Sequence, residues 1–368
     1  MARVFQFHPH IFAADAIGYT IRALHQVLRR AGHAAFMVCS VPPPRGTGGD
    51  LHDISELKEV SWRPDDLLIL HHSFDNPELA AVLDLPVRRA LVYHNVTPAK
   101  FFFDNDMPAI GEAAERARQQ LGEIAPAVQV AIGDSEYNAA ELGDYGFDNR
   151  VAIPVFYDDA FFRSRAVDWP LYQETKAAAR INLVFIGRFV PNKRVDRVIE
   201  TASAYAALFG RDVRLHLIGK IFDEAYTAAL IARAAELRIL ASLRLHLDAA
   251  ALRLKTLLAA ADAFVSFSEH EGFMVPIVEA FTVGCPVIAR RAAAVGETMG
   301  GAGFALDAAD PQLVAGLVEL LRRDRQSRRA LLRQQYRRAA DFRSGRTAGR
   351  WLALLQREFD LPMAGGAC

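Results

Sequence analysis

The sequence is poor in cysteine and has no long uninterrupted run of apolar residues. Its 368 residues include three cysteines, Cys39, Cys285 and Cys368, which form no CxxC pair and no disulfide framework. Scattered cysteines of this kind favour a reducing, cytoplasmic setting. No stretch of about 18 apolar residues is available to span a bilayer, and the first residues, MARVFQFHPH, lack the apolar core of a signal peptide. We therefore expect a cytoplasmic protein, with contact at the inner face of the plasma membrane left open.

An excess of charge of either sign is also missing. Lys and Arg together number 43, and so do Asp and Glu, so no overall field favours a nucleic-acid partner. The chain is 52% hydrophobic and 23% charged, which is ordinary for a folded enzyme. At about 100–200 residues per domain, the length predicts two domains.

Short apolar runs alternate with amphipathic segments along the whole chain. The predicted strands of the first half are Val4–Phe7, Ala35–Ser40, Leu67–His71, Ala90–His94, Val128–Gly133 and Val151–Phe156. Those of the second half are Leu183–Gly187, Val213–Ile218, Leu243–Leu247, Ala263–Phe267 and Pro286–Ala289. Strands that alternate with helices predict parallel sheets covered by helices on both faces.

The two halves predict two Rossmann-like, doubly wound α/β domains that face each other across a cleft. We place them at residues 1–165 and 166–340, with a linker near Asp158–Arg180, which is polar and only weakly periodic. In such sheets a ligand binds at the carboxyl ends of the strands. A cleft between the domains is therefore the expected ligand site.

One segment after a predicted strand is rich in polar groups. It runs Ser268-Glu-His-Glu-Gly-Phe-Met-Val-Pro-Ile-Val-Glu-Ala and opens a helix, with Glu271 and Glu279 seven residues apart. Gly272 allows close approach of the backbone to a ligand, and Pro276 suits a first helical turn. The start of this helix suits a phosphate or a sugar hydroxyl, and Glu279 suits a vicinal diol such as ribose. The alternative is a capped helix with two incidental glutamates.

A second segment places two cations after another strand. In Phe185-Ile-Gly-Arg-Phe-Val-Pro-Asn-Lys-Arg-Val-Asp196, Arg188 follows the strand and Lys193 stands just before a helix. Two fixed cations at this position can bind a diphosphate and neutralise it as a leaving group. The alternative is an ordinary solvated loop.

Together, the two segments resemble the donor-binding half of family 4 glycosyltransferases of the bacterial polysaccharide type, which have the GT-B fold. The resemblance extends from about Ile181 to Phe304 and includes Gly284-Cys-Pro-Val-Ile-Ala289. It departs from the family after the strand Leu243–Leu247, where the family often has a glycine and this chain has Asp248. It departs again in Asp15-Ala-Ile-Gly18, which has one glycine instead of a pair.

The resemblance implies roles for individual residues. Arg188 and Lys193 hold the donor diphosphate, Glu279 binds the ribose, and Glu271 holds the transferred sugar. The catalytic residues implied are Glu271, His94, Arg188 and Lys193. The implied donor-binding residues are Gly18, Arg188, Lys193, Gly219, Lys220, Glu271, Gly272, Phe273, Met274 and Glu279. No metal site is implied, and no cofactor is required.

Polar residues also follow the strands of the first half. These include five histidines, namely His8, His10, His71, His72 and His94. Parallel strands end at one sheet edge, so we expect a polar substrate surface there. The segment Asp134-Ser135-Glu136 either faces the same cleft or simply caps a helix. Asp104-Asn-Asp106, in a Phe-rich loop, is interpreted as surface and not as a metal-binding DxD.

The resemblance implies a retaining, metal-independent hexosyltransferase whose donor is a UDP-, GDP- or dTDP-sugar. The acceptor is a glycan or a polyprenyl-linked glycan, peripheral membrane contact is left open, and no nucleic acid takes part. Retention through a covalent intermediate and same-face attack both stay open. The alternatives are a GT-B nucleotide-sugar epimerase and a catalytically silent sugar-nucleotide-binding protein.

The end of the chain is expected to return to the first domain. In the family the last helix crosses back, so we assign residues 341–368 to this role. The segment has an apolar stripe at Trp351, Leu352, Leu354 and Leu355 that a packed helix would bury. The other possibility is a helix that caps the second domain.

Overall fold

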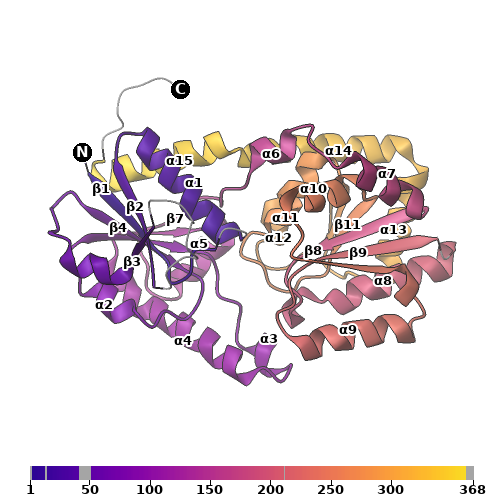
Figure 1. Ribbon diagram of the computed structural model, residues 1–368, viewed down its shortest axis with the longest axis horizontal. Helices are drawn as coiled ribbons and strands as arrows, with labels where there is room; N and C mark the ends of the chain where they lie inside the picture. Colours follow the sequence, from indigo (N-terminus) through magenta and orange to yellow (C-terminus); the bar gives the residue numbers. More distant parts are fainter. Residues whose placement is uncertain (1, 13–14, 41–50, 211, 362–368) are drawn as a thin grey trace. The chain divides into compact units, whose positions relative to one another are not determined.

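The computed structural model describes residues 2–12, 15–40, 51–210 and 212–361. The chain divides into two compact units, shown in Figure 1. Unit 1 consists of Met1–Tyr157 and Phe342–Cys368, and unit 2 of Asp158–Asp341. Each unit is described by itself below. Cys368 lies outside the described residues, whereas Cys39 and Cys285 are buried free thiols.

Unit 1 is built on a parallel sheet. Its strands are β1 (Arg3–Phe7), β2 (Ala34–Cys39), β3 (Leu51–Asp53), β4 (Leu67–His72), β5 (Arg88–Tyr93), β6 (Val130–Gly133) and β7 (Arg150–Ala152). Its helices are α1 (Ala16–Arg30), α2 (Leu79–Leu83), α3 (Lys100–Phe103), α4 (Pro108–Ile124), α5 (Glu136–Gly143) and α15 (Ser344–Phe359). Among the described residues the order is β3-β2-β1-β4-β5-β6-β7, with all neighbours parallel.

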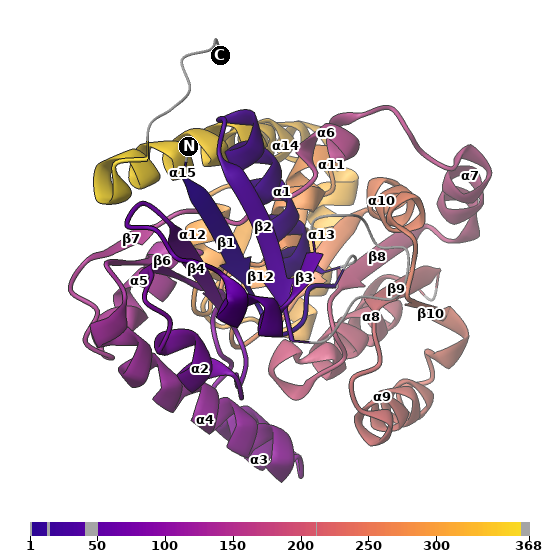
Figure 2. The same ribbon diagram turned by 60° about the vertical axis from the view of Figure 1, so that its left-hand side comes forward.

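The core of unit 1 includes a helix from the far end of the chain. Trp351, Leu354, Leu355 and Phe359 of α15 are at most 3% exposed and pack in one cluster with β1, β4 and β5. α15 lies beside α1 (Figure 2). Arg88 of β5 donates from Nη1 to the carbonyl oxygen of Phe359 over 3.0 Å. The core of unit 1 is therefore completed by a helix that follows the last strand of the unit, β7, by more than 180 positions in the sequence.

Unit 2 repeats the design. Its strands are β8 (Ile181–Ile186), β9 (Val213–Gly219), β10 (Leu243–Leu247), β11 (Ala263–Ser266), β12 (Val287–Arg290) and β13 (Phe304–Leu306). Its helices are α6 (Asp159–Arg163), α7 (Trp169–Ala178), α8 (Val195–Phe209), α9 (Glu224–Glu236), α10 (Ala251–Ala260), α11 (Val275–Val283), α12 (Val295–Met299), α13 (Pro311–Arg323) and α14 (Arg325–Ala339). Over the described part of the unit the order is β10-β9-β8-β11-β12-β13, again with all neighbours parallel.

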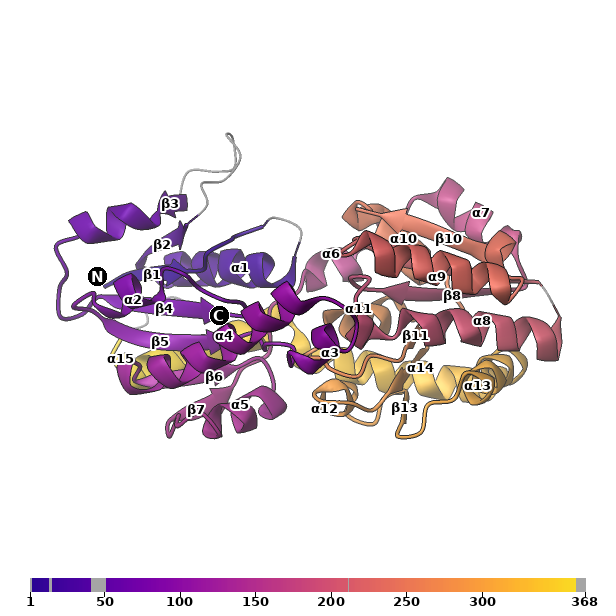
Figure 3. The ribbon, with the colours of Figure 1, turned by 90° about the horizontal axis from the view of Figure 1, so that it is seen from below.

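The central strands of unit 2 are buried on both faces. β8 reads INLVFI and every residue in it is buried, as expected for a parallel strand between two layers of helices. Side chains of β8 and β9 pack with those of α8, α9 and α13 in one core cluster, and α8 and α13 lie side by side (Figure 3). Asp310 caps α13, because its carboxylate accepts from the backbone nitrogens of Gln312 and Leu313.

The structure differs from expectation at the short elements. β3 and β13 have three half-buried residues each, too few to show a period in the sequence. The segment expected as a linker contains α6 and α7, and both belong to unit 2. α7 buries only Thr175, which explains its weak periodicity. Within the described residues, the helices are too short or too polar to cross a membrane.

Candidate active site

The strand order of unit 2 has a switch point between β8 and β11. These strands are neighbours, but the chain continues from β8 to β9 on one side and from β11 to β12 on the other. Loops that leave the carboxyl ends of such a pair diverge and make room for a ligand. Arg188 and Lys193 follow β8, and Glu271 follows β11. Three residues indicated by the sequence therefore lie in the two loops at this point.

Lys193 and Glu271 form an ion pair that joins the two loops. Lys193 Nζ lies 2.7 Å from Glu271 Oε2, and the two side chains are 15% and 10% exposed. Asn192, which is 2% exposed, also joins the two loops by hydrogen bonds. Its Nδ2 donates to the carbonyl oxygen of His270 over 3.1 Å, and its carbonyl accepts from the backbone nitrogen of Glu269 over 2.7 Å. The ammonium group is therefore fixed in place before any ligand arrives.

The structure shows a second ionic cluster beside this pair, around Glu269, which was not predicted from the sequence. Glu269 Oε1 accepts from Arg194 Nη1 over 3.0 Å and from Arg290 Nη1 over 2.5 Å. Arg194 also donates to both carboxylate oxygens of Asp196. The available signal was the position of Glu269, two residues before Glu271 in the same polar segment. Arg290 ends a strand far along the chain, and only the sheet order brings it close.

The turn before α11 is held in an unusual conformation. Met274, the residue before the helix, has φ 73°, in the left-handed region that residues with side chains rarely adopt. Thr298 Oγ1 donates to the carbonyl oxygen of Phe273 over 2.6 Å, and Phe273 and Met274 are each 6% exposed. The turn from Gly272 to Met274 is therefore fixed at a helix N-terminus, where the helix dipole favours negative charge.

Glu279 lies on α11 and has no hydrogen bond or ion pair with any described residue. Burial raises the pKa of its carboxyl group to about 8, although the side chain keeps partial exposure. A carboxyl group that is withdrawn from water and has no partner is costly for the folded chain. A ligand that donates hydrogen bonds to it would remove that cost.

Arg188 and Lys220 are exposed at the same end of the sheet. The Arg188 guanidinium carbon lies 5.6 Å from the centre of the Phe222 ring, and Lys220 Nζ lies 3.5 Å from Asp248 Oδ1. Asp248 has φ 48° and stands where the family often has glycine. Aspartate tolerates this left-handed conformation better than most residues.

Two glycines expected at the donor have packing reasons inside their own units. A Cβ on Gly219 would lie 1.9 Å from the carbonyl oxygen of Gly187, and a Cβ on Gly18 would lie 1.8 Å from that of Phe12. Either substitution would force backbone to move. Contact of Gly18 with donor phosphates, and of Gly219 with the base, stays a prediction.

In unit 1 a chain of buried polar side chains runs across four neighbouring strands. His94 Nδ1 lies 2.8 Å from Asp134 Oδ2, and His94 Nε2 lies 2.9 Å from His71 Nδ1. His71 Nε2 lies 3.2 Å from Gln6 Oε1, and Gln6 Nε2 donates to the carbonyl oxygen of Ile21 over 3.1 Å. The His94 side chain is 1% exposed. Both of its ring nitrogens are therefore used inside unit 1 in this structure.

Burial lowers the pKa of three histidines at this edge, His8, His71 and His72. Burial, aided by His94, lowers the pKa of His8 to about 3, and burial lowers that of His72 to about 4. The pKa of the fully buried His71 is well below its ordinary value for the same reason. Burial also raises the pKa of Asp134, against the opposing influence of His94. This sheet edge therefore offers hydrogen-bonding groups with little charge.

The other candidates of unit 1 have ordinary surroundings. Ser135 caps α5, accepting at Oγ from the backbone nitrogen of Asn138 over 3.1 Å. Asp104 and Asp106 are exposed after α3. No group of three or more His, Cys, Asp or Glu residues within the described ranges is arranged to hold a metal ion.

Comparison with known sequences places the switch-point loops inside a matched region. Residues 173–338 match the family "Glycosyl transferases group 1". The chain is also 32% identical over 168 residues to the MMP alpha-(1->4)-mannosyltransferase of Mycolicibacterium hassiacum. That match covers 45% of this chain and 40% of the length of the mannosyltransferase.

Solved structures resemble the chain over nearly its whole length. The Anabaena protein HepE in complex with UDP and glucose has a TM-score of 0.78 at 14% identity, covering 96% of this chain and 99% of that one. Sucrose-phosphate synthase from Thermosynechococcus elongatus has a TM-score of 0.76 at 16% identity, covering 98% and 100%. The predicted fold class, two doubly wound parallel-sheet α/β domains of the GT-B fold, is confirmed.

Proposed function

We propose that this chain is a glycosyltransferase that takes a hexose from a nucleotide diphosphate sugar held by unit 2. The observation that carries the proposal is the pairing of Lys193 with Glu271 at the switch point of unit 2, within the region that matches the glycosyltransferase family. The alpha-mannosyltransferase relative and the UDP-glucose complex of HepE support a nucleotide-sugar donor. Neither an epimerase nor a silent binding protein is favoured by these relatives.

In the proposed mechanism the charged loops of unit 2 receive the donor diphosphate. Lys193 and Arg188 neutralise the charge that develops on the leaving nucleotide, and the turn at Gly272–Met274 donates backbone hydrogen bonds. Glu271, released from part of its pairing with Lys193, accepts hydrogen bonds from the transferred sugar. Glu279 accepts the two ribose hydroxyls, which gives its buried carboxyl group the partners that it lacks.

The finer assignments rest on the family resemblance. We propose retention at the anomeric carbon, no required metal, and a UDP-, GDP- or dTDP-sugar as donor. The acceptor, proposed to be a glycan or polyprenyl-linked glycan at the inner membrane face, would bind unit 1, with His94 directed to the donor sugar. Since both nitrogens of His94 are occupied in this structure, that role requires its bond to His71 or Asp134 to open.

The test combines each nucleotide sugar with an acceptor extract and with buffer alone. We expect transfer of labelled hexose only when both donor and acceptor are present, at an unchanged rate in EDTA, and with an α-linked product from an α-linked donor. Epimerised sugar from the donor alone would favour an epimerase. Binding without any turnover would favour a silent protein, and loss of activity in EDTA restored by Mn²⁺ would contradict the metal-independent mechanism.

A further inference from the structure

α14 carries a row of arginines that makes no polar or ring contact with any other residue in the described part of the chain. Arg325, Arg329, Arg333 and Arg337 are spaced four residues apart and are all exposed. None of the four has a hydrogen bond, ion pair or ring contact with any described residue. Residues four apart lie above one another on a helix. We call these four residues the arginine row.

The opposite side of α14 is firmly attached to unit 2. Leu331, Gln335 and Ala339 are at most 8% exposed. Gln335 Nε2 donates to the carbonyl oxygen of Cys285 over 2.8 Å, and its Oε1 accepts from the backbone nitrogen of Val287 over 3.3 Å. Arg329, Arg333 and Arg337 each stand two positions from one of these buried residues, about 200° around the helix, and Arg325 stands six positions before Leu331, about 240° around the helix. The arginine row therefore lies on the solvent-exposed side of α14.

Other arginines of the same helix do serve the structure. Arg328 Nη1 donates to the carbonyl oxygen of Asp262 over 3.0 Å. Arg338 Nε donates to the carbonyl oxygen of Thr298 over 3.1 Å, and its Nη1 pairs with Asp341 at 3.0 Å. α14 therefore carries two kinds of arginine. Arg328 and Arg338 bond the helix to the rest of unit 2, whereas the arginines of the row make no polar or ring contact with any described residue.

The arginine row works against the stability of its own helix. α14 contains no acidic residue, and like charges four residues apart destabilise a helix. Arg325 is the first helical residue, where the dipole disfavours a cation. Asp324, before it, is occupied as the cap and accepts from the backbone nitrogens of Gln326 and Ser327. An external anion is the partner that this arrangement lacks.

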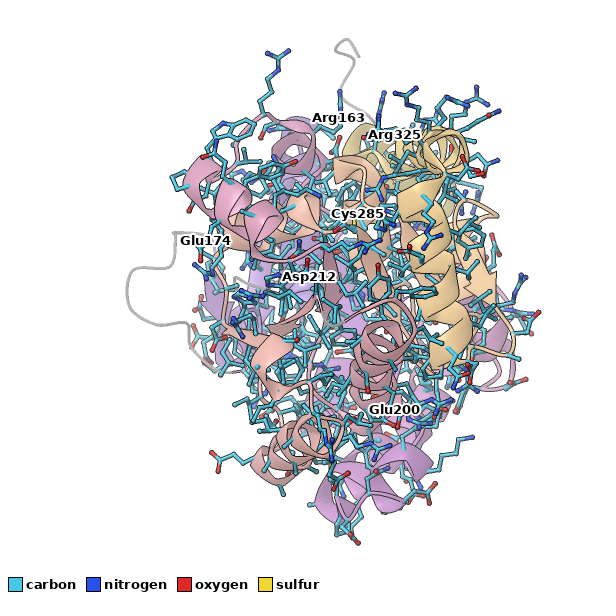
Figure 4. All side chains as sticks on the ribbon, turned by 90° about the vertical axis from the view of Figure 1, so that its right-hand side faces the viewer. Arg163, Glu174, Glu200, Asp212, Cys285 and Arg325 are labelled. Atoms are coloured by element: carbon cyan, nitrogen blue, oxygen red, sulfur yellow. The ribbon has the colours of Figure 1, made fainter. Side chains whose placement is uncertain are left out.

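We propose that the arginine row is a docking surface for an anionic phospholipid bilayer. The row is about 18 Å long at 1.5 Å per residue and turns by about 40° around the helix at each step of four residues, so that its long side chains reach out over one broad side of α14. Guanidinium groups bind phosphate oxygens in a two-pronged manner. In Figure 4 nitrogen-tipped side chains project outward around the labelled Arg325.

A bilayer fits this surface better than a nucleic acid does. The whole chain has a formal net charge of +0, whereas nucleic-acid-binding domains are usually basic overall. A cluster of four basic residues is enough for binding at an anionic membrane surface. The proposal does not depend on the proposed glycosyl transfer, since it concerns a surface of α14 and not the switch-point loops.

The test is co-sedimentation of the full chain with phosphatidylcholine vesicles, with and without phosphatidylglycerol. We expect binding only to the anionic vesicles, and weaker binding as salt rises from about 0.05 to about 0.5 M. Replacing all four row arginines by glutamine should weaken binding by about 10²-fold or more, because each basic side chain at such a surface contributes about fivefold. The double variant Arg329→Gln/Arg333→Gln should show an intermediate loss, and both variants should melt no lower than the original chain.

The matched control removes the same charge elsewhere. Four exposed arginines outside the row, Arg30, Arg63, Arg165 and Arg253, are replaced by glutamine. This control should bind the anionic vesicles as the original chain does. Equal losses in the row and control variants would overturn the proposal, as would no binding to the anionic vesicles at low salt. Binding to a short single-stranded RNA that depends on the row, with no vesicle binding, would overturn it in favour of a nucleic-acid partner.

Discussion

Units 1 and 2 share the order of six strands, to which unit 1 adds β7, but they differ in the groups placed at the carboxyl ends of their strands. In unit 1 these groups are buried histidines that hydrogen-bond one another, as His94 does with His71. In unit 2 they are ions, including the pair Lys193 and Glu271 and the cluster around Glu269. The same sheet therefore supports a nearly neutral polar surface in one unit and a charged site in the other.

The difference follows from the burial and the partners of the polar groups at each sheet edge. At the edge of unit 1, burial lowers the pKa of His8 to about 3 and that of His72 to about 4, so these two histidines stay neutral. In unit 2 the ions are partly exposed, and Glu279 has no partner among the described residues. A diphosphate ligand needs charge, and a sugar hydroxyl needs hydrogen bonds. The comparison supports the assignment of the donor to unit 2.

The largest expected effect concerns the stability of unit 1, which depends on the buried side chains of α15. Deletion of Gly349–Cys368 removes five buried side chains of the unit 1 core, namely Trp351, Leu354, Leu355, Phe359 and Leu361. Losing a buried Leu or aromatic side chain typically costs about 2–5 kcal/mol, so the sum exceeds the stability of a typical domain, about 5–15 kcal/mol. We expect proteolysis to degrade unit 1, while unit 2 still binds the nucleotide. Two intact units after the deletion would show that α15 is dispensable.

The next effect concerns the cations of unit 2. Lys193→Ala or Arg188→Ala should lower turnover by about 10²–10³-fold, the scale for losing one preorganised donor to a developing charge. Both variants should keep the melting temperature of the original chain. Arg233→Ala, which removes a cation paired with Glu200 and Glu236 on the surface of the same unit, serves as the control and should stay active. Equal activity of all these variants would remove the cations from the mechanism.

A smaller effect is expected for the unpartnered carboxyl group. Glu279→Gln replaces one acceptor oxygen with a donor, so the ribose diol loses a good partner. Affinity for the free nucleotide should fall by about 1.5–3 kcal/mol, the range for a hydrogen bond to a charged group. The control is Glu224→Gln at an exposed position of α9. Calorimetry that gives the same affinity for the Glu279→Gln variant and the original chain would exclude the ribose role.

The same carboxyl group predicts a pH dependence. In the free protein its pKa is raised to about 8, so it is mostly protonated at neutral pH. The diol donates to the ionised form, and binding therefore favours loss of the proton. Nucleotide affinity should rise with pH up to about 8 and then level off. The pH profile of Glu279→Gln should lack this rise, and superimposable profiles would argue against the assignment.

The smallest effect should come from unit 1. Asp134→Asn weakens the hold on the His94 ring but touches none of the ions of unit 2. We expect nucleotide affinity to change by less than about 0.5 kcal/mol, as for sites without shared partners, while turnover falls. A large loss of nucleotide affinity would mean that the two edges are not independent.

The sequence predicted the long elements because buried parallel strands such as β8 are continuous apolar runs. It could not predict β13, whose three residues are half-buried. The family resemblance indicated Lys193 and Glu271 as site residues, whereas their ion pair became visible only in the structure. The hydrogen bonds of Asn192 to His270 and of Arg290 to Glu269 depend on strand order, which brings together residues far apart in the chain.

The most direct test of the central claim measures the binding of UDP, GDP and dTDP by thermal shift in the original chain and in Lys193→Ala. We predict that one nucleotide, at about 100 times its dissociation constant, stabilises the original chain by about 2.7 kcal/mol. At the same concentration it should stabilise Lys193→Ala much less. Stabilisation by none of the three, or equal stabilisation of both proteins, would contradict the placement of a nucleotide diphosphate at the switch point of unit 2.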